Sequence, residues 1–242
     1  MKNIKKKSIP LLFFGIFLNI FTIHSQSSNE ILVSKWFDKS AGKETLPISN
    51  GKFHLNFDKT VGNANRYYNS EELTKGSLGY DSQEYFEVNL KYDIYKDEII
   101  LTSQGESNLI EVNLIKEKIQ YFKLNEKKFV NLNTDNLLSI NFRGGYYEEN
   151  LIGKNFTFYI KHYKEKKEII KSDVLYIDYT YRHEFILFRK GTYTIINTKG
   201  QLLKVLPNDK KKINDYYLMN RNLRKENEAK FMENLMRYIN NI

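Results

Sequence analysis

The chain has 242 residues, and its 38 Lys and Arg against 29 Asp and Glu give a formal charge of +9. It contains no cysteine, which excludes disulfides, thiolate metal sites, cysteine nucleophiles and a lipid-modified cysteine anchor. Any chemistry must therefore come from other side chains.

Residues 1–25 have the order of a secretory signal, because a lysine-rich start precedes an apolar run from Ile9 to Ile23. The run is shorter than the roughly 20 residues that a helix needs to cross a bilayer. We therefore expect cleavage near Gln26 and no transmembrane segment afterwards. A retained anchor is the alternative. An exported chain without disulfides fits a bacterial envelope, in the periplasm or associated with the outer membrane or the cell exterior.

Removal of residues 1–25, which hold four lysines and no acid, lowers the formal charge from +9 to +5. The remaining positive charge reflects a composition rich in Lys, Asn, Ile and Tyr, so no nucleic-acid partner is expected.

The mature chain divides into three parts. Residues 26–84 are loop-rich, with about one strand, at Phe53–Phe57. Residues 85–206 consist of short β-branched and aromatic runs separated by Gly, Asn, Asp and Lys, which predicts an antiparallel β domain. Residues 207–242 have helical spacing and should pack on the same domain.

Individual hairpins can be predicted within the β domain. Strands Tyr146–Leu151 and Asn155–Tyr163 are joined through Gly153-Lys154. Three further strands, Phe185–Arg189, Thr192–Asn197 and Gln201–Val205, are separated by Lys190-Gly191 and by Thr198-Lys199-Gly200, where the glycines would supply a positive φ. Because no helix intervenes, the sequence predicts a meander of about eight to ten strands, twisted into a sandwich or partial barrel.

Two helices are predicted at the C-terminus. Asn208 can cap the first, over Asp209–Asn220, and the second begins near Lys225. The second helix places an apolar stripe on one face, which needs a surface to cover: Phe231, Leu235, Tyr238, Ile239 and Ile242.

The stretch YFEVNLKYDIYKDEIIL, residues 85–101, contains the densest group of acids. Its apolar positions are even-numbered up to Ile94 and odd-numbered from Ile99, which predicts a hairpin that pairs Ile94 with Ile99 and Tyr92 with Leu101. Asp93 would then lie on the wetter face, and Asp97 and Glu98 would lie at the tip. The acids have no calcium-loop spacing.

The stretch from Asn65 to Leu101, the segment YTIINTKGQLLKVL and the terminal Tyr238-Ile239-Asn240 resemble a set of exported proteins of the Bacteroidota, especially flavobacteria. Those proteins share a signal peptide, a similar "lkYdiydDeie" hairpin, a later segment matching Gly145-Tyr146-Tyr147 and a terminal helical pair. The resemblance covers roughly residues 65–242 and implies location and architecture. It carries over no catalytic residue.

The sequence predicts no catalytic, metal or cofactor residue. Gly76-Ser77-Leu78-Gly79 has the wrong spacing for a nucleophile elbow, and Ala41–Thr45 lacks most of a phosphate loop. Adjacent Glu148 and Glu149 should face opposite sides of a strand, so they cannot pair as glycosidase acids. Three histidines remain after signal cleavage, isolated in sequence and most simply structural: His54, His162 and His183.

Two compositional features bear on binding. The 18 Tyr and 16 Phe could stack on sugars or line an apolar groove, and aromatic residues on both faces of 176–181 indicate a second layer or a partner. Basic residues near the C-terminus could contact anionic lipid headgroups or lipopolysaccharide, or could form a solvated helix surface: Lys210, Lys211, Lys212, Arg221, Arg224, Lys225, Lys230 and Arg237.

We therefore expect a non-enzymatic, exported envelope protein that binds a protein partner or an anionic envelope component. One alternative is a carrier for an apolar or sugar ligand inside a curved aromatic sheet. The other is a hydrolase whose site residues are remote in sequence, which would need a cleft where two of the histidines or several carboxylates converge.

Overall fold

The computed structural model describes Leu32 and residues 46–102, 110–132 and 144–241, so the predicted signal lies outside the described residues. The chain divides into two units between Leu46 and Pro47, and the elements below belong to the second unit, Pro47–Ile242. Three short 3-10 turns connect them, η2 (Pro47–Ser49), η3 (Lys116–Lys118) and η4 (Pro207–Asp209).

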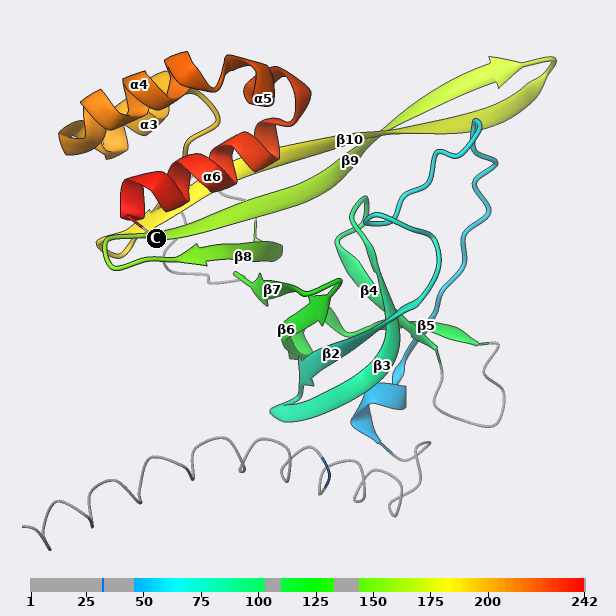
Figure 1. The fold of residues 1–242 in the computed structure, drawn as a ribbon. Helices are drawn as coiled ribbons and strands as arrows, with labels where there is room; N and C mark the ends of the chain where they lie inside the picture. The colour runs from blue at the N-terminus through cyan, green and yellow to red at the C-terminus, as the bar shows by residue number, and fades with distance from the viewer. Residues whose placement is uncertain (1–31, 33–45, 103–109, 133–143, 242) are drawn as a thin grey trace, which may run out of the picture. The chain divides into compact units, whose positions relative to one another are not determined.

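A single antiparallel sheet of eleven strands dominates the described residues and does not close (Figure 1). Its spatial order is β1-β5-β4-β3-β2-β6-β7-β8-β9-β10-β11. The strands are β1 (Gly51–Phe53), β2 (Thr74–Tyr80), β3 (Gln83–Asp93), β4 (Glu98–Thr102), β5 (Glu111–Leu114), β6 (Ile119–Leu124), β7 (Lys127–Asn131), β8 (Tyr146–Ile152), β9 (Thr157–Lys171), β10 (Val174–Arg189) and β11 (Thr192–Ile195).

This architecture confirms the mainly β, antiparallel prediction with C-terminal helices. Two adjacencies depart from a simple meander, because β6 pairs with β2 and β1 pairs with β5. Residues 47–84 contain β1, β2 and the first two residues of β3, where the sequence predicted about one strand, at Phe53–Phe57. That predicted strand is largely wrong, since β1 ends at Phe53 and residues 54–57 form no strand. The missed strand, β2, contains two glycines, which weaken the strand pattern.

Two-residue turns set the register of four hairpins. Both turn residues have positive φ in Asp81-Ser82, Asn125-Glu126, Ser172-Asp173 and Lys190-Gly191, as type I′ turns require. The predicted turn at Gly191 is therefore confirmed. The Ser172-Asp173 turn joins the two longest strands, β9 and β10, into a hairpin paired from Thr157 to Phe188.

The predicted register of the β3–β4 hairpin is wrong by two residues. Tyr92 pairs with Ile99 and Leu90 with Leu101, so four residues, 94–97, form the turn. Asp93 favours this longer turn, since its Oδ1 accepts hydrogen bonds of 3.0 Å from the backbone N–H groups of both Tyr95 and Lys96.

The strand predicted at Gln201–Val205 is instead a helix, α3 (Lys199–Val205), and Gly200 lies inside it rather than in a hairpin loop. Thr198 and Gln201 form a capping box, because the Thr198 side chain accepts a hydrogen bond from the Gln201 N–H and the Gln201 side chain accepts one from the Thr198 N–H. These two hydrogen bonds start a helix where β-branched and apolar residues suggested a strand.

Three further helices follow where two were predicted: α4 (Lys210–Met219), α5 (Arg221–Glu226) and α6 (Glu228–Asn240). The stripe on α6 is largely confirmed, since Phe231, Leu235 and Ile239 are buried. Tyr238 is 44 % exposed, and Ile242 lies outside the described residues.

The helices cover one face of β8–β10 (Figure 1). Side chains from α3, α4 and α6 form one hydrophobic core with Phe158 and Ile160 of β9 and with Phe185 and Leu187 of β10. The other strands enclose a second cluster, made of aromatic rings in contact with one another: Tyr68, Tyr92, Phe122, Phe129 and Tyr146.

Candidate functional site

His162 is the buried centre of a row of polar side chains that crosses three strands. Its Nε2 is 2.7 Å from Oε2 of Glu148 on β8, and its Nδ1 is 2.5 Å from the hydroxyl of Tyr181 on β10. His162 and His183 are also cross-strand partners, so two histidines that are distant in sequence are neighbours. As predicted, Glu149 lies away from Glu148 and pairs instead with Lys128.

Burial and hydrogen bonding set the charge states in this row. Burial raises the pKa of Glu148, but the hydrogen bond from His162, the charge of His162 when it is protonated, and hydrogen bonds from Lys127 and Asn150 outweigh it and lower that pKa to about 2. Burial lowers the pKa of His162 below its usual value. A neutral His162 that donates from Nε2 to Glu148 and accepts at Nδ1 from Tyr181 satisfies both contacts.

Asp97 is not a solvated turn residue, contrary to the sequence prediction. Its carboxylate is 16 % exposed and lies 2.5 Å from Nζ of Lys116 and 2.7 Å from Nζ of Lys161, and it accepts a hydrogen bond of 2.5 Å from the Tyr92 hydroxyl. Burial raises the pKa of Asp97, but the two lysines more than offset this and hold it below its usual value. The predicted tip is thus a buried ionic contact.

Asp93 is also buried, which corrects its assignment to a wetter face. Its Oδ2 lies 2.6 Å from Nε of Arg66, in the strap, a name we use for residues 58–68. The strap continues to β10, where Thr60 bridges Ile177 and Asp58 accepts a hydrogen bond from Tyr179. Of the aromatic residues on this strand, Tyr179 therefore contacts another segment of the same chain, whereas Tyr181 is 43 % exposed.

His54 bonds to side chains from other elements rather than to a ligand. Its Nδ1 is 2.8 Å from Oδ1 of Asn113, and its Nε2 is 2.8 Å from the Tyr67 hydroxyl. His183 is 3.4 Å from Glu228 of α6. Among the residues that the structure describes, no group of three His, Asp or Glu side chains could hold a metal ion. These polar clusters hold segments together, although Nδ1 of His183 has no hydrogen-bond partner among the described residues.

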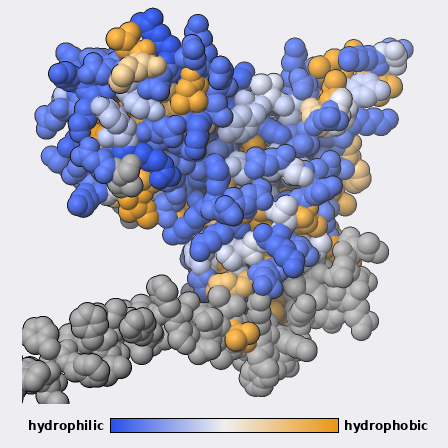
Figure 2. Space-filling view, viewed as in Figure 1, coloured by the Kyte–Doolittle hydropathy of each residue, from blue (hydrophilic) through white to orange (hydrophobic). Residues whose placement is uncertain are grey.

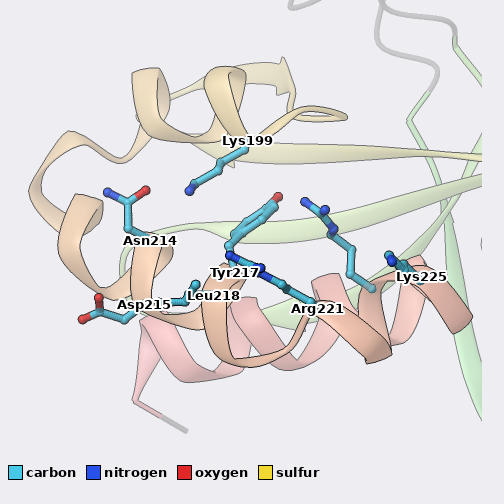
Figure 3. A pocket seen from close by; sticks show the side chains of 8 residues that line it. Lys199, Asn214, Asp215, Tyr217, Leu218, Arg221 and Lys225 are labelled. Carbon is cyan, nitrogen blue, oxygen red and sulfur yellow. The ribbon is translucent and has the colours of Figure 1, made fainter.

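The feature best suited to bind a ligand is a basic pocket of about 590 Å³, lined by residues of α3, α4 and α5 (Figure 3). It contains four basic side chains and one acid. Its lining residues are Lys199, Asn214, Asp215, Tyr217, Leu218, Arg221, Arg224 and Lys225.

Tyr217 organises the cations of this basic pocket. Nζ of Lys199 lies 5.1 Å from the centre of its ring, and the guanidinium carbon of Arg224 lies 5.3 Å from it. Figure 3 shows Lys199 reaching from α3 towards this ring on the facing α4. Cation–π attraction therefore holds two positive charges close together in the pocket.

The cations of the basic pocket lack acidic partners. Across residues 46–102, 110–132 and 144–241, no carboxylate lies within 4.0 Å of Lys199, Arg221, Arg224 or Lys225 in a salt bridge. Their charge is thus available to a ligand. By contrast, a smaller pocket at the β9–β10 hairpin is lined by two lysines and two aspartates, and so is balanced in charge.

The sequence identified three of these residues, Arg221, Arg224 and Lys225, within a longer basic list. The structure separates these three from the other basic residues of that list, which do not line the basic pocket. Lys199 was missed because it was assigned to a hairpin loop. The capping box at Thr198 was the signal that could have placed it on a helix.

No helix among the described residues is long and apolar enough to span a membrane. Comparison with protein-family models, with curated proteins and with solved structures gave no match to this chain.

Proposed function

We propose that the protein is an exported, non-enzymatic envelope protein that binds an anionic envelope component in the basic pocket. The observation that carries this proposal is the set of four basic side chains around Tyr217 without salt-bridged acids in the described residues. Like charges held close together repel one another, and a bound anion relieves this repulsion.

The chemistry of the lining favours an oxyanion as the ligand. Arg221 and Arg224 can each offer a planar pair of N–H donors, which match phosphate or carboxylate oxygens. Lys199 and Lys225 add point charges, and the Asn214 amide adds a neutral donor. The single acid, Asp215, leaves an excess of three positive charges. Phosphate or carboxylate groups of an envelope component would satisfy these donors.

The export part of the proposal is supported by the lysine-rich and apolar order of residues 1–25. Expression of the full chain with its own N-terminus in a bacterial host should yield a shortened protein in the envelope fraction. N-terminal sequencing should then place the cleavage near Gln26. A full-length protein in the cytoplasmic fraction would contradict export.

The carrier alternative has weaker support. It calls for a concave aromatic surface, whereas the rings of Tyr92, Phe122 and Phe129 are buried and pack against one another, with Phe122 and Phe129 stacked 4.7 Å apart. The hydrolase alternative is also weaker. His162 and His183 do converge, but His162 is 3 % exposed and bonds through both ring nitrogens inside the protein.

Calorimetric titration with inorganic tripolyphosphate tests the basic pocket directly, because this soluble probe carries several oxyanion groups. We expect saturable binding that weakens as salt is added. Arg221→Gln with Arg224→Gln should reduce affinity by about ten-fold or more, since each change removes a charge-assisted hydrogen-bond donor. Both positions are exposed, so the fold should be retained.

The matched control for this titration is Lys211→Gln with Arg237→Gln, which removes the same charge at exposed positions outside the basic pocket. It should bind tripolyphosphate almost as well as the wild type. Equal losses in the two double variants would show that overall charge, rather than the pocket, determines binding, and would overturn the proposal.

A further inference from the structure

We infer that the anionic component is the headgroup of an acidic phospholipid, and that the corner between α4 and α5 docks on a membrane surface. This inference rests on the proposed function and specifies its ligand. It is drawn from a second observation, the exposed apolar side chains beside the basic pocket.

Leu218 and Met219 are the last two residues of α4, and they are 59 % and 68 % exposed. Leu218 lines the basic pocket, and Arg221 follows within three residues at the start of α5. Two consecutive exposed apolar residues thus adjoin a concentration of unpaired cations. Figure 2 shows that the visible described surface is mostly hydrophilic, with hydrophobic residues in separate patches.

This pairing of chemistries distinguishes a lipid from a soluble polyanion. A nucleic acid or a free phosphate compound contacts the cations but gains nothing from Leu218 and Met219, because it has no hydrocarbon to place against them. At a bilayer, cations meet the headgroups while adjacent apolar side chains enter the interfacial region below them. An acidic phospholipid therefore uses both features, whereas a soluble polyanion uses only the cations.

The arrangement also fits a surface contact rather than a spanning one. The helices that carry the basic pocket are short, and the longest, α4, has 10 residues. Ile213 of α4 is buried in the core with the sheet, so α4 is held by the protein while its last residues remain exposed. A rigid attachment of this kind presents the cations without the cost of ordering a flexible segment.

Vesicle sedimentation of the mature full chain tests the inference. We expect binding to vesicles of phosphatidylcholine mixed with phosphatidylglycerol and none to vesicles of phosphatidylcholine alone. Arg221→Gln with Arg224→Gln should lower the partition coefficient by roughly 25-fold, at about five-fold for each basic residue removed. The control, Lys211→Gln with Arg237→Gln, should stay closer to the wild type.

A further variant, Met219→Ser, separates lipid from soluble anion, because Met219 does not line the basic pocket. It should lower vesicle binding by about five-fold while its affinity for tripolyphosphate stays unchanged, because it removes an apolar contact and no charge. Thermal unfolding followed by circular dichroism should show a wild-type melting temperature for this variant, since the side chain is exposed.

Two outcomes would overturn the lipid inference and leave the proposed function standing. One is tripolyphosphate binding by the wild type without vesicle binding. The other is unchanged vesicle binding by the Met219→Ser variant. Tighter binding of single-stranded DNA than of acidic vesicles, sensitive to Arg221→Gln with Arg224→Gln, would also overturn it. If the wild type bound neither tripolyphosphate nor acidic vesicles, the proposed function would be overturned as well.

Discussion

At the scale of single residues, Asp97 and Glu148 are carboxylates largely enclosed by cationic and polar partners, which a simple β-sheet protein would not require. Asp97 occupies a turn and Glu148 the interior of strand β8, positions that sequence pattern alone would assign to solvent or to one polar face. Each is surrounded by partners distant in sequence, since Asp97 contacts Lys161 and Glu148 contacts His162 and Lys127. Their electrostatic environment should dominate the effects of substitution.

Replacing Asp97 with Asn should destabilise the protein strongly. The change keeps the shape of the side chain but leaves Lys161, which is buried, without its counter-charge. Removal of one partner from a buried ion pair costs about 3–5 kcal/mol. Urea unfolding at neutral pH should report a loss of this size.

The control for this prediction is Asp81→Asn, at another turn residue with positive φ. Asp81 also pairs with a lysine, Lys118, but both side chains are exposed, so stability should hardly change. If Asp97→Asn and Asp81→Asn had the same small effect, the carboxylate of Asp97 would be solvated as the sequence suggested.

Glu148 should make stability depend on pH in the acid range. Its pKa is about 2 in the folded protein against an ordinary value of 4.5. A lowered pKa contributes stability that is fully present above 4.5 and is lost as pH falls through about 2. The contribution is on the order of 3 kcal/mol.

Glu148→Gln should remove this contribution while keeping an oxygen that can accept from His162. The measured quantity is the difference in unfolding free energy between wild type and variant, because Asp97 adds its own acid dependence to both. That difference should be largest at neutral pH and should shrink as pH falls below 4.5. A difference that stayed constant through this range would show that the charge of Glu148 contributes nothing.

At the scale of elements, short hydrogen-bonded signals decided the structures that hydrophobic pattern left ambiguous. The segment Gln201–Val205 has strand-like composition, yet the reciprocal hydrogen bonds of Thr198 and Gln201 place it at the start of α3. Lys190-Gly191 was recognised as a turn because glycine tolerates positive φ. Asn125-Glu126 and Ser172-Asp173 adopt the same conformation without glycine and carried no comparable signal.

Thr198→Ala should weaken α3 and lower the stability of the protein by about 1 kcal/mol, through loss of the side-chain half of the capping box. Thr198→Ser keeps the hydroxyl group and should be close to the wild type. Thermal unfolding of the three proteins tests this prediction. Equal melting temperatures for the Ala and Ser variants would contradict a capping role.

Irregularities within strands also limited the prediction of which side chains face the core. The alternation in β3 placed Phe86 on the same face as Val88, but a bulge at Glu87, which has positive φ, puts the buried Tyr85 there instead. A bulge shifts the side chains on one side of it to the opposite face. Alternation alone cannot locate that shift.

At the scale of the whole molecule, the class of fold followed from composition, whereas the buried polar contacts did not. Dense β-branched and aromatic runs without intervening helices predicted an antiparallel sheet, and the α6 stripe predicted a helix on its surface. The strap, however, has the sequence of a surface loop, and yet it contacts the buried residues Asp93 and Ile177. The basic pocket likewise depends on α3 facing α4, which no local pattern encodes.

The two cores share strand β9 and should therefore unfold together. Phe158 and Ile160 pack under the helices, and His162, two residues further on, contacts the rings of Tyr68 and Phe129. Leu235→Ala in α6 should lower the free energy of unfolding by about 2–5 kcal/mol, because Leu235 is fully buried.

Hydrogen exchange measures whether the loss of stability caused by Leu235→Ala extends to both cores. The slowest amides of β3, which does not belong to the helical core, should exchange faster by the same factor as those of β9. Unchanged protection in β3 would mean that the helical layer opens independently of the curved part of the sheet.

The contact between Asp97 and Lys161 also constrains the order in which the chain folds. It joins residues 64 positions apart, and five described strands, β4 to β8, lie between β3 and β9 in chain order. Until β9 is in place, the turn of the β3–β4 hairpin has to hold a carboxylate without one of its two lysines. Contacts of such sequence separation slow folding, because the loop between them must be ordered first. The early hairpin is thus completed by one of the later strands.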